Sequence, residues 1–152
     1  MQRLKAAEEM YQYCVDNDLG VGDGKEWAIE SFKTLIWEME PDEEIYFVFP
    51  GRYICEGLTI DRSCAIAVTS KRIISVEVTP SGDWSSRIVK HEHIHDDVTL
   101  ERKMIAEGCF HIGYIHVSDA FCYSVDISLA DNIYKRLHEV LDMIREQKLQ
   151  EE

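Results

Sequence analysis

The residues whose types and spacing most clearly suggest chemistry are three histidines at alternate positions in the segment KHEHIHDD, namely His91, His93 and His95. Alternate residues of a β-strand point to the same face, and an HxH pair on one face can chelate a divalent metal ion. Further ligands of suitable type lie nearby in the sequence: Glu101, His111 and His116. The pattern therefore raises a metal-binding protein or metal-dependent enzyme as one hypothesis.

Two hypotheses about the histidine row stay open. A metal-dependent enzyme of the cupin type, built on a jelly roll, would use an HxH pair followed by a glutamate. The interval from His95 to Glu101 is longer than in that motif, and no second histidine-containing motif with its glycine and proline is visible. The other hypothesis is a solvated sheet face, on which the histidines titrate near their ordinary pKa of about 6.5 without partners. We favour the second hypothesis and assign no catalytic, cofactor or metal residue.

The five cysteines predict a reducing, cytoplasmic environment. The number of cysteines is odd, they are widely spaced, and no two form a CxxC motif. They are Cys14, Cys55, Cys64, Cys109 and Cys122. Each lies in an apolar or strand-like segment, where a reduced thiol behaves as a small core residue. The N-terminal segment mixes charges throughout, and no apolar stretch approaches the roughly 18 to 20 residues of a membrane-spanning helix. We expect a protein that is neither exported nor membrane-spanning.

The net charge of −13 disfavours several classes of partner. Residues 1–44 alone hold four basic and twelve acidic side chains, which gives this part of the chain a net charge of −8. Such a surface repels nucleic-acid phosphates and anionic lipid head groups, and it has no basic stripe that would release counterions from DNA. We therefore expect no nucleic-acid partner, and we expect membrane lipid to be a poor ligand.

The N-terminal part of the chain predicts two amphipathic helices. Residues 2–17 place apolar side chains at helical spacing: Leu4, Ala7, Tyr11, Cys14 and Val15. The glycine-rich segment LGVGDG then ends this helix. Asp23 and Glu26 have the spacing of a capping box for a second helix, which Pro41 ends. Residues 1–41 are thus predicted to form a helical extension.

From residue 43 the hydrophobic period changes from about 3.6 to 2, which is typical of β-strands. We expect seven strands: 44–49, 63–69, 72–79, 86–94, 98–105, 109–117 and 121–127. The turns between them are indicated by Ser70-Lys71, Pro80-Ser81-Gly82-Asp83, Asp96-Asp97 and Ser118-Asp119. This succession predicts an antiparallel meander. A final helix, capped by Ser128 and Asp131, would cover the open end of the sheet.

The stretch from DEEIYFVFPGRY to AIAVTSKRIISVEV resembles the bacterial pleckstrin-homology-like families. Those families show an acidic pair, an apolar strand ending in a glycine-containing turn, and a T-x-K-R hairpin followed by two hydrophobic residues. In this chain the hairpin residues are Thr69, Lys71, Arg72, Ile73 and Ile74. The resemblance implies an α+β fold over residues 42–149, namely a seven-stranded antiparallel β-sandwich or partly open barrel capped by a C-terminal helix.

The resemblance also implies a binding or self-association module rather than an enzyme. Members that bind phosphoinositides carry clustered basic residues around the first hairpin, where this chain has only Arg52 and Arg62, with Lys71 and Arg72 further on. We therefore expect a protein or peptide partner, or a second copy of the chain, bound through a groove or a sheet edge. The expected edge lies between the first hairpin and the C-terminal helix. The acidic extension would cover that edge, dock a partner or mediate self-association.

Overall fold

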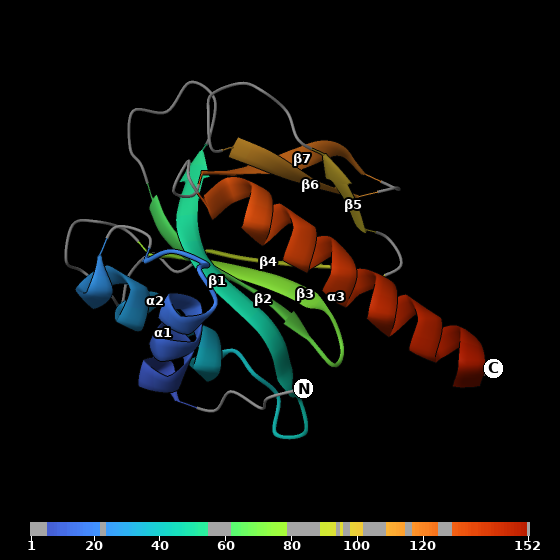
Figure 1. Cartoon of the computed structure of the whole chain (residues 1–152), viewed down its shortest axis with the longest axis horizontal. Helices are drawn as coiled ribbons and strands as arrows, with labels where there is room; N and C mark the ends of the chain where they lie inside the picture. Colours follow the sequence, from blue (N-terminus) through green and yellow to red (C-terminus); the bar gives the residue numbers. More distant parts are fainter. Residues whose placement is uncertain are drawn as a thin grey trace.

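The computed structural model of the chain describes residues 6–21, 24–54, 62–78, 89–93, 95, 98–101, 109–114, 117–124 and 129–151. Two helices come first, α1 (Ala7–Asp16) and α2 (Lys25–Trp37). The strands that follow are β1 (Ile45–Ile54), β2 (Arg62–Thr69), β3 (Ile73–Val78), β4 (Val89–His93), β5 (Val98–Glu101), β6 (Cys109–Tyr114) and β7 (Val117–Ser124). The last element is α3 (Ala130–Glu151). The predicted α+β class is confirmed, because an antiparallel sheet precedes a C-terminal helix (Figure 1).

The two N-terminal helices pack against the sheet and share its hydrophobic core. The buried apolar face of α1 consists of Ala7, Met10 and Cys14, at the i, i+3, i+7 spacing of a single helix face. The predicted stripe is wrong at Val15, which is 42% exposed, because Met10 takes the inward position instead. In α2, Ala28, Phe32 and Leu35 are buried in the same core.

The start of α2 differs from its prediction. The N-cap is Gly24, with a φ of 121°, and no side chain caps the helix. Glycine adopts this backbone conformation readily because it has no Cβ. The predicted capping box is therefore wrong in its N-cap residue, Asp23, which itself lies outside the described residues.

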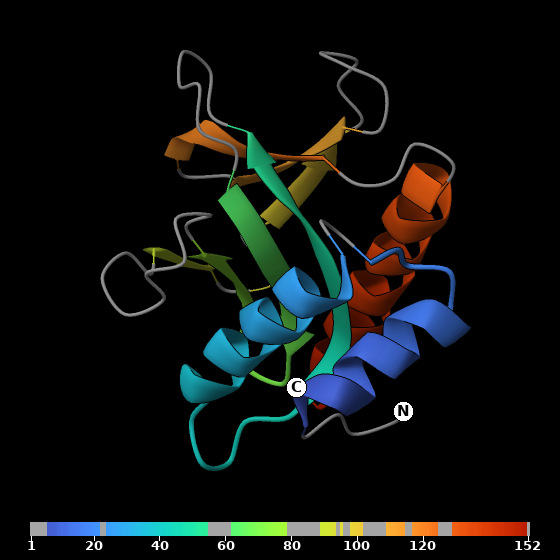
Figure 2. The ribbon, with the colours of Figure 1, turned by 90° about the vertical axis from the view of Figure 1, so that its left-hand side faces the viewer.

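The strand order of the sheet is β4-β3-β2-β1-β7-β6-β5, and neighbouring strands are antiparallel. The predicted meander is wrong at one connection, since β4 and β5 form opposite edges of the sheet instead of pairing. The reason is the length of β1, which pairs with β2 over most of its course and with β7 at its end, from Arg52 to Ile54. Figure 2 shows β1 as the long strand that joins both groups of strands.

β1 continues through Pro50 and Gly51, where the family resemblance implies a glycine-containing turn. Pro50 lies opposite Ala65, and Gly51 lies opposite Cys64, so the ladder with β2 is not broken there. Proline has no backbone N–H to donate. A strand tolerates it at positions where the N–H would not bond to a neighbouring strand. The tertiary pairing thus overrides the local turn preference of the dipeptide.

The connection between β6 and β7 also lies earlier than predicted. β7 begins at Val117, and Ser118 and Asp119, which the sequence predicts to be a turn, lie inside the strand. Tyr114 pairs with Val117, which places the connection at residues 115–116. The turn at Ser70-Lys71 is confirmed, because the Thr69 N–H donates to the Arg72 carbonyl at 2.8 Å. The turns predicted at 80–83 and 96–97, and the Ser128 cap, lie outside the described residues.

α3 closes the core and holds the end of α1. Its inner face buries Ile133, Leu137, Leu141 and Ile144 in the same cluster as the sheet and the N-terminal helices. The Asn132 side-chain amide donates to the carbonyls of the two residues that follow α1, at 3.1 and 2.9 Å. These bonds satisfy carbonyl groups that a helix end leaves unpaired. None of the helices in the described ranges has the length and apolarity needed to span a lipid bilayer.

Candidate functional site

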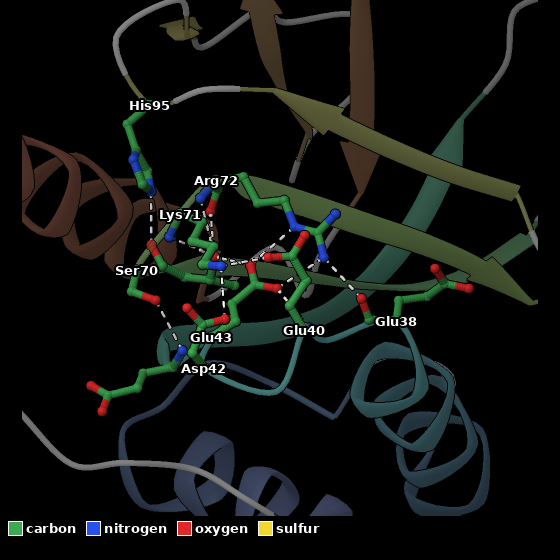
Figure 3. Close-up of polar contacts among 10 residues, drawn as sticks. Glu38, Glu40, Asp42, Glu43, Ser70, Lys71, Arg72 and His95 are labelled. Atoms are coloured by element: carbon green, nitrogen blue, oxygen red, sulfur yellow. Dashed lines mark hydrogen bonds and ion pairs between the residues drawn. The ribbon is translucent and has the colours of Figure 1, made fainter.

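The turn of the β2–β3 hairpin is organised by the hydroxyl group of Thr69. Figure 3 shows Lys71 and Arg72 of this turn beside Glu43. This hydroxyl accepts hydrogen bonds from the N–H groups of Lys71 and Arg72, both at 3.1 Å. It donates to Oε2 of Glu43, which lies in the segment between α2 and β1. A short polar side chain that bonds to the backbone two and three residues ahead favours a turn at this place. The T-x-K-R motif is therefore a turn linked to the helical extension.

Arg72 connects the same turn to two points of the segment that follows α2. Its Nε donates to Glu43 Oε2 at 3.0 Å, and its Nη2 donates to Glu43 Oε1 at 2.9 Å. Nη2 also donates to the carbonyl of Glu38, the C-cap residue of α2, at 2.8 Å. The guanidinium group thus binds one carboxylate with two nitrogens and also caps a helix end.

The ion pair between Arg72 and Glu43 is shielded from water, with exposed side-chain fractions of 14% and 0%. Burial on its own raises the pKa of Glu43, but hydrogen bonds from Arg72 and Thr69 outweigh it and hold the pKa below its ordinary value. Glu43 is therefore ionised in the folded protein at neutral pH. A carboxylate held in this state by two fixed donors is suited to joining structural elements rather than to transferring protons.

Lys71 lies on the surface of the same hairpin and is held by two carboxylates. Its Nζ contacts Glu40 at 2.5 Å and Asp42 at 2.8 Å, and all three side chains are substantially exposed. The hydrogen bonds that Lys71 donates to Asp42 and Glu40 raise the pKa of Lys71, and the bond to Asp42 lowers the pKa of Asp42. Both cations of the T-x-K-R motif therefore carry carboxylate partners from the chain itself, which leaves little positive charge for a phosphate group.

His95 belongs to this junction and not to a solvated surface. Its side chain is buried, and its Nε2 lies 2.7 Å from the carbonyl oxygen of Thr69. A carbonyl oxygen only accepts, so Nε2 carries the proton and donates. The carbonyl of His95 in turn accepts from Nη2 of Arg145 in α3, at 2.7 Å. His95 therefore links the hairpin turn to the C-terminal helix.

The structure divides the predicted histidine row. The favoured hypothesis of an exposed row is wrong for His95, because this ring is buried, and its Nε2 cannot ligate a metal while it donates to Thr69. His91 and His93 lie in β4 opposite Ser75 and Ile73, but their side chains lie outside the described residues, so their role stays a prediction. Among the described side chains, no group of three His, Cys, Asp or Glu residues is placed to hold a metal ion.

The proposed supplementary ligands lie at the far side of the strand order. Glu101 of β5 and His111 of β6 are direct cross-strand partners, whereas His91 and His93 lie in β4, at the other edge of the sheet. His116 lies outside the described residues. Where the backbone is described, the sheet does not bring these residues next to the β4 histidines.

The partner-binding edge predicted between the first hairpin and the C-terminal helix would include β1, and α1 contacts this strand. The Cys14 thiol donates to the carbonyl oxygen of Val48 at 3.4 Å, so α1 contacts the main chain of β1 directly. Figure 2 shows α1 next to the lower end of β1. Burial raises the pKa of the Cys14 thiol well above its ordinary value, which keeps the thiol protonated and able to donate. An added strand could reach this part of β1 only by displacing α1.

Two strands form the edges of the sheet, β4 and β5. β4 has the sequence VKHEH, which places four charged or titratable residues in a row of five. β5 has the sequence VTLE, which is richer in residues that favour strands. Its neighbour β6 contacts α3, and Figure 1 shows β5 above the middle of that helix. β5 is therefore an edge strand whose partner β6 contacts α3, and an edge strand can accept an extended peptide.

No family model matches the sequence, and no curated protein matches it. Solved structures do match its fold. The hSac2 domain from the human phosphoinositide phosphatase Sac2 aligns over 82% of this chain and 82% of its own, with 8% identity and a TM-score of 0.57. Human RhoA in complex with the DH/PH fragment of PDZRHOGEF aligns over 73% of this chain, with 12% identity and a TM-score of 0.50. The fold is pleckstrin-homology-like.

A second DH/PH structure, the ternary complex of human RhoA, its inhibitor and the DH/PH domain of human ARHGEF11, aligns over 66% of this chain with 12% identity and a TM-score of 0.46. The chain spans only 29% and 31% of the two DH/PH-containing chains that it matches. The chain is thus similar in fold to one part of the longer chain of the PDZRHOGEF complex. Identities of 8% and 12% show the fold alone.

The hairpin of the site is visible in the sequence, but most of the residues that bond to it are not. The T-x-K-R motif and the acidic pair Glu43-Glu44 are both visible in the sequence, and the structure joins them through Glu43. His95 is missed as a buried residue because its alternation with His91 and His93 suggests a shared face. The signal that could have separated it is its place after the strand, beside Asp96 and Asp97.

Proposed function

We propose that this chain is a non-catalytic protein-binding module that captures an extended peptide by adding it as a strand to the edge of β5. The observation that carries the proposal is the strand order, which leaves β5 paired with β6 on one side only within the described residues. An edge strand presents a row of N–H and C=O groups, and these give affinity to an added strand without requiring a basic surface.

The choice of β5 rests on a comparison with the other candidate edges. β1 contacts α1 at Val48, whose carbonyl accepts a hydrogen bond from the Cys14 thiol. β4 is rich in charged and titratable residues, which natural proteins use to prevent strand addition. β5 has neither feature over Val98, Thr99 and Leu100, and α3 contacts the neighbouring strand β6.

A protein ligand agrees better with the site than a phosphoinositide does. Lys71 and Arg72 are the basic residues of the T-x-K-R motif, and both are bound to carboxylates of the chain itself. The net charge of −13 further disfavours an anionic surface. A DH/PH fragment of similar fold is seen in complex with the protein RhoA, which supports a protein partner for this fold.

The proposal is tested with a pair of proline substitutions in β5. Adjacent residues of an edge strand turn their N–H and C=O groups to opposite sides, so one of Thr99 and Leu100 bonds to β6 while the other faces outward. The probe is a set of twelve-residue peptides selected from a random phage library on the unaltered full chain. Of Thr99→Pro and Leu100→Pro, the variant that keeps the wild-type melting temperature identifies the outward residue.

We expect the stable proline variant to lose at least about tenfold in affinity for the selected peptides, because it removes one main-chain donor and blocks the ladder next to it. A proline introduced into β4, at Lys90, serves as the matched control and should leave affinity unchanged. Selected peptides that bind both β5 variants as tightly as the unaltered chain would disprove the proposal, as would a library that yields no binding peptide.

We also propose a reducing, cytoplasmic location and treat a second copy of the chain as the alternative partner. Cys14 is buried and forms no disulfide bond, which agrees with a reducing compartment. Sedimentation equilibrium of the purified chain over a hundredfold range of concentration tests self-association. A single monomeric species would leave a different protein as the partner of β5.

A further inference from the structure

Trp37 is the most exposed of the large apolar side chains that the structure describes. It is the last residue of α2, and its exposed fraction is 85%. Tryptophan is usually buried over most of its surface because of its large apolar area. The inner face of the same helix is filled by Phe32 and Leu35, which are fully buried. Trp37 is therefore directed outward by helix geometry.

The outward face of α2 leads to this indole. Glu26, Glu30, Lys33 and Trp37 follow each other at the helical spacing of four, three and four residues. Lys33 is bound to Glu30 at 3.4 Å, so the middle of this face carries no net charge. Figure 2 shows α2 on the outer side of the molecule, facing the viewer. A partner lying along α2 would therefore meet the indole as its main apolar contact.

The segment directly after Trp37 is strongly acidic. Residues 38–44 hold five carboxylates and no basic side chain. Arg72 compensates Glu43 in the interior, and Lys71 is one cation shared by Glu40 and Asp42. The side chains of Glu40 and Asp42 are 54% and 75% exposed. The surface that follows the indole is therefore still net negative after its ion pairs are formed.

We propose that Trp37, Glu40 and Asp42 form a docking surface for a basic segment of a protein partner. An arginine side chain of the partner stacks on the indole of Trp37, since tryptophan is the best aromatic acceptor for a cation and arginine stacks on aromatic faces. A second basic side chain meets Glu40 and Asp42, and the net charge of −13 attracts such a segment at long range. This surface lies on the helical extension and is additional to the proposed β5 edge.

The same charges argue against two other occupants. A second copy of the chain brings another net charge of −13 and therefore repels the acidic segment. An anionic membrane surface repels it for the same reason. A basic protein segment satisfies both the apolar group and the carboxylates.

The test is a titration of the full chain with a blocked seven-residue peptide of alternating glycine and arginine. The indole N–H signal of Trp37 in a two-dimensional NMR spectrum, assigned with Trp37→Phe, reports on the site itself. We expect this signal to shift on binding and Trp37→Ala to lower the affinity at least about fivefold. Val15→Ala, which shortens another exposed apolar side chain, should leave the affinity unchanged. The same peptide with citrulline in place of arginine should not bind.

Equal affinity of Trp37→Ala and the unaltered chain would overturn the proposal, and so would equal binding of the citrulline peptide. A dimer in sedimentation equilibrium that disappears in Trp37→Ala would assign the surface to self-association and would likewise overturn it. None of these results affects the β5 proposal, because the Thr99 and Leu100 proline variants report on that edge alone.

Discussion

Arg72 and Glu43 form a two-nitrogen, two-oxygen ion pair, with Nε to Oε2 at 3.0 Å and Nη2 to Oε1 at 2.9 Å. One residue belongs to the hairpin turn and the other to the segment between α2 and β1. The pair therefore joins the helical extension to the sheet. Because Glu43 is fully buried, the pair must be intact for its burial to be tolerated.

Removal of the arginine should destabilise the protein. Arg72→Ala leaves a buried carboxylate without its charged partner, and we expect it to lower the free energy of unfolding by about 3 kcal/mol. Lys71→Ala is the matched control, because its partners are exposed and its loss should cost much less than that of Arg72. Urea unfolding measures both values. Equal costs for the two variants would contradict a structural role specific to Arg72.

The same ion pair predicts how stability depends on pH. The pKa of Glu43 in the folded protein is held below its ordinary value of 4.5. Its contribution to stability is therefore fully present above about pH 4.5 and is lost as the pH falls through the folded pKa. Glu43→Gln removes this contribution, so the stability difference between the two proteins should shrink from pH 6 to pH 3. Urea midpoints across that range test it, and a constant difference would refute the assignment.

Cys14 should be unreactive in the native protein. Its side chain is fully buried, and burial raises the pKa of the thiol, so the reactive thiolate is scarce. We expect iodoacetamide to modify Cys14 and the equally buried Cys64 much more slowly in the native protein than in urea. Mass spectrometry of the corresponding peptides measures this. Native labelling of Cys14 at the rate seen in urea would show that α1 does not cover β1 as described.

Two aromatic residues of α2 should differ sharply in their effect on stability. Phe32→Ala removes a fully buried ring, and we expect a loss of about 3 to 5 kcal/mol. Trp37→Ala removes an exposed ring, and we expect a change within about 0.5 kcal/mol. Thermal and urea unfolding compare them. A large loss for Trp37→Ala would mean that the indole packs on the protein and does not present itself to a partner.

The change of hydrophobic period near residue 43 predicts the order of helices and strands. This works because the burial of one face sets the spacing of apolar residues within each element. The pairing of β1 with β7 is not predicted, since it joins residues about 70 positions apart and leaves no local pattern. Pro50 and Gly51 favour a turn locally. Their pairing with β2 keeps them in the strand, and this pairing leaves no local pattern in the sequence.

The candidate site is likewise predicted only in part from the sequence. The hairpin residues Thr69 and Arg72 are found from their motif, but their bonds to Glu43 and Glu38 depend on how the extension packs on the sheet. Trp37 follows the apolar residues Leu35 and Ile36 in the sequence, and its exposure results from the direction in which α2 turns its inner face. Sequence spacing alone does not give that direction.

Hydrogen exchange of the β5 amides, measured by NMR with and without a selected peptide, tests strand addition most directly. We predict that peptide binding slows amide exchange strongly at whichever of Thr99 and Leu100 turns its N–H away from β6. Exchange in β4 should not change. Unchanged exchange throughout β5, with the new protection located in β4 or at the α1 contact with β1, would contradict it.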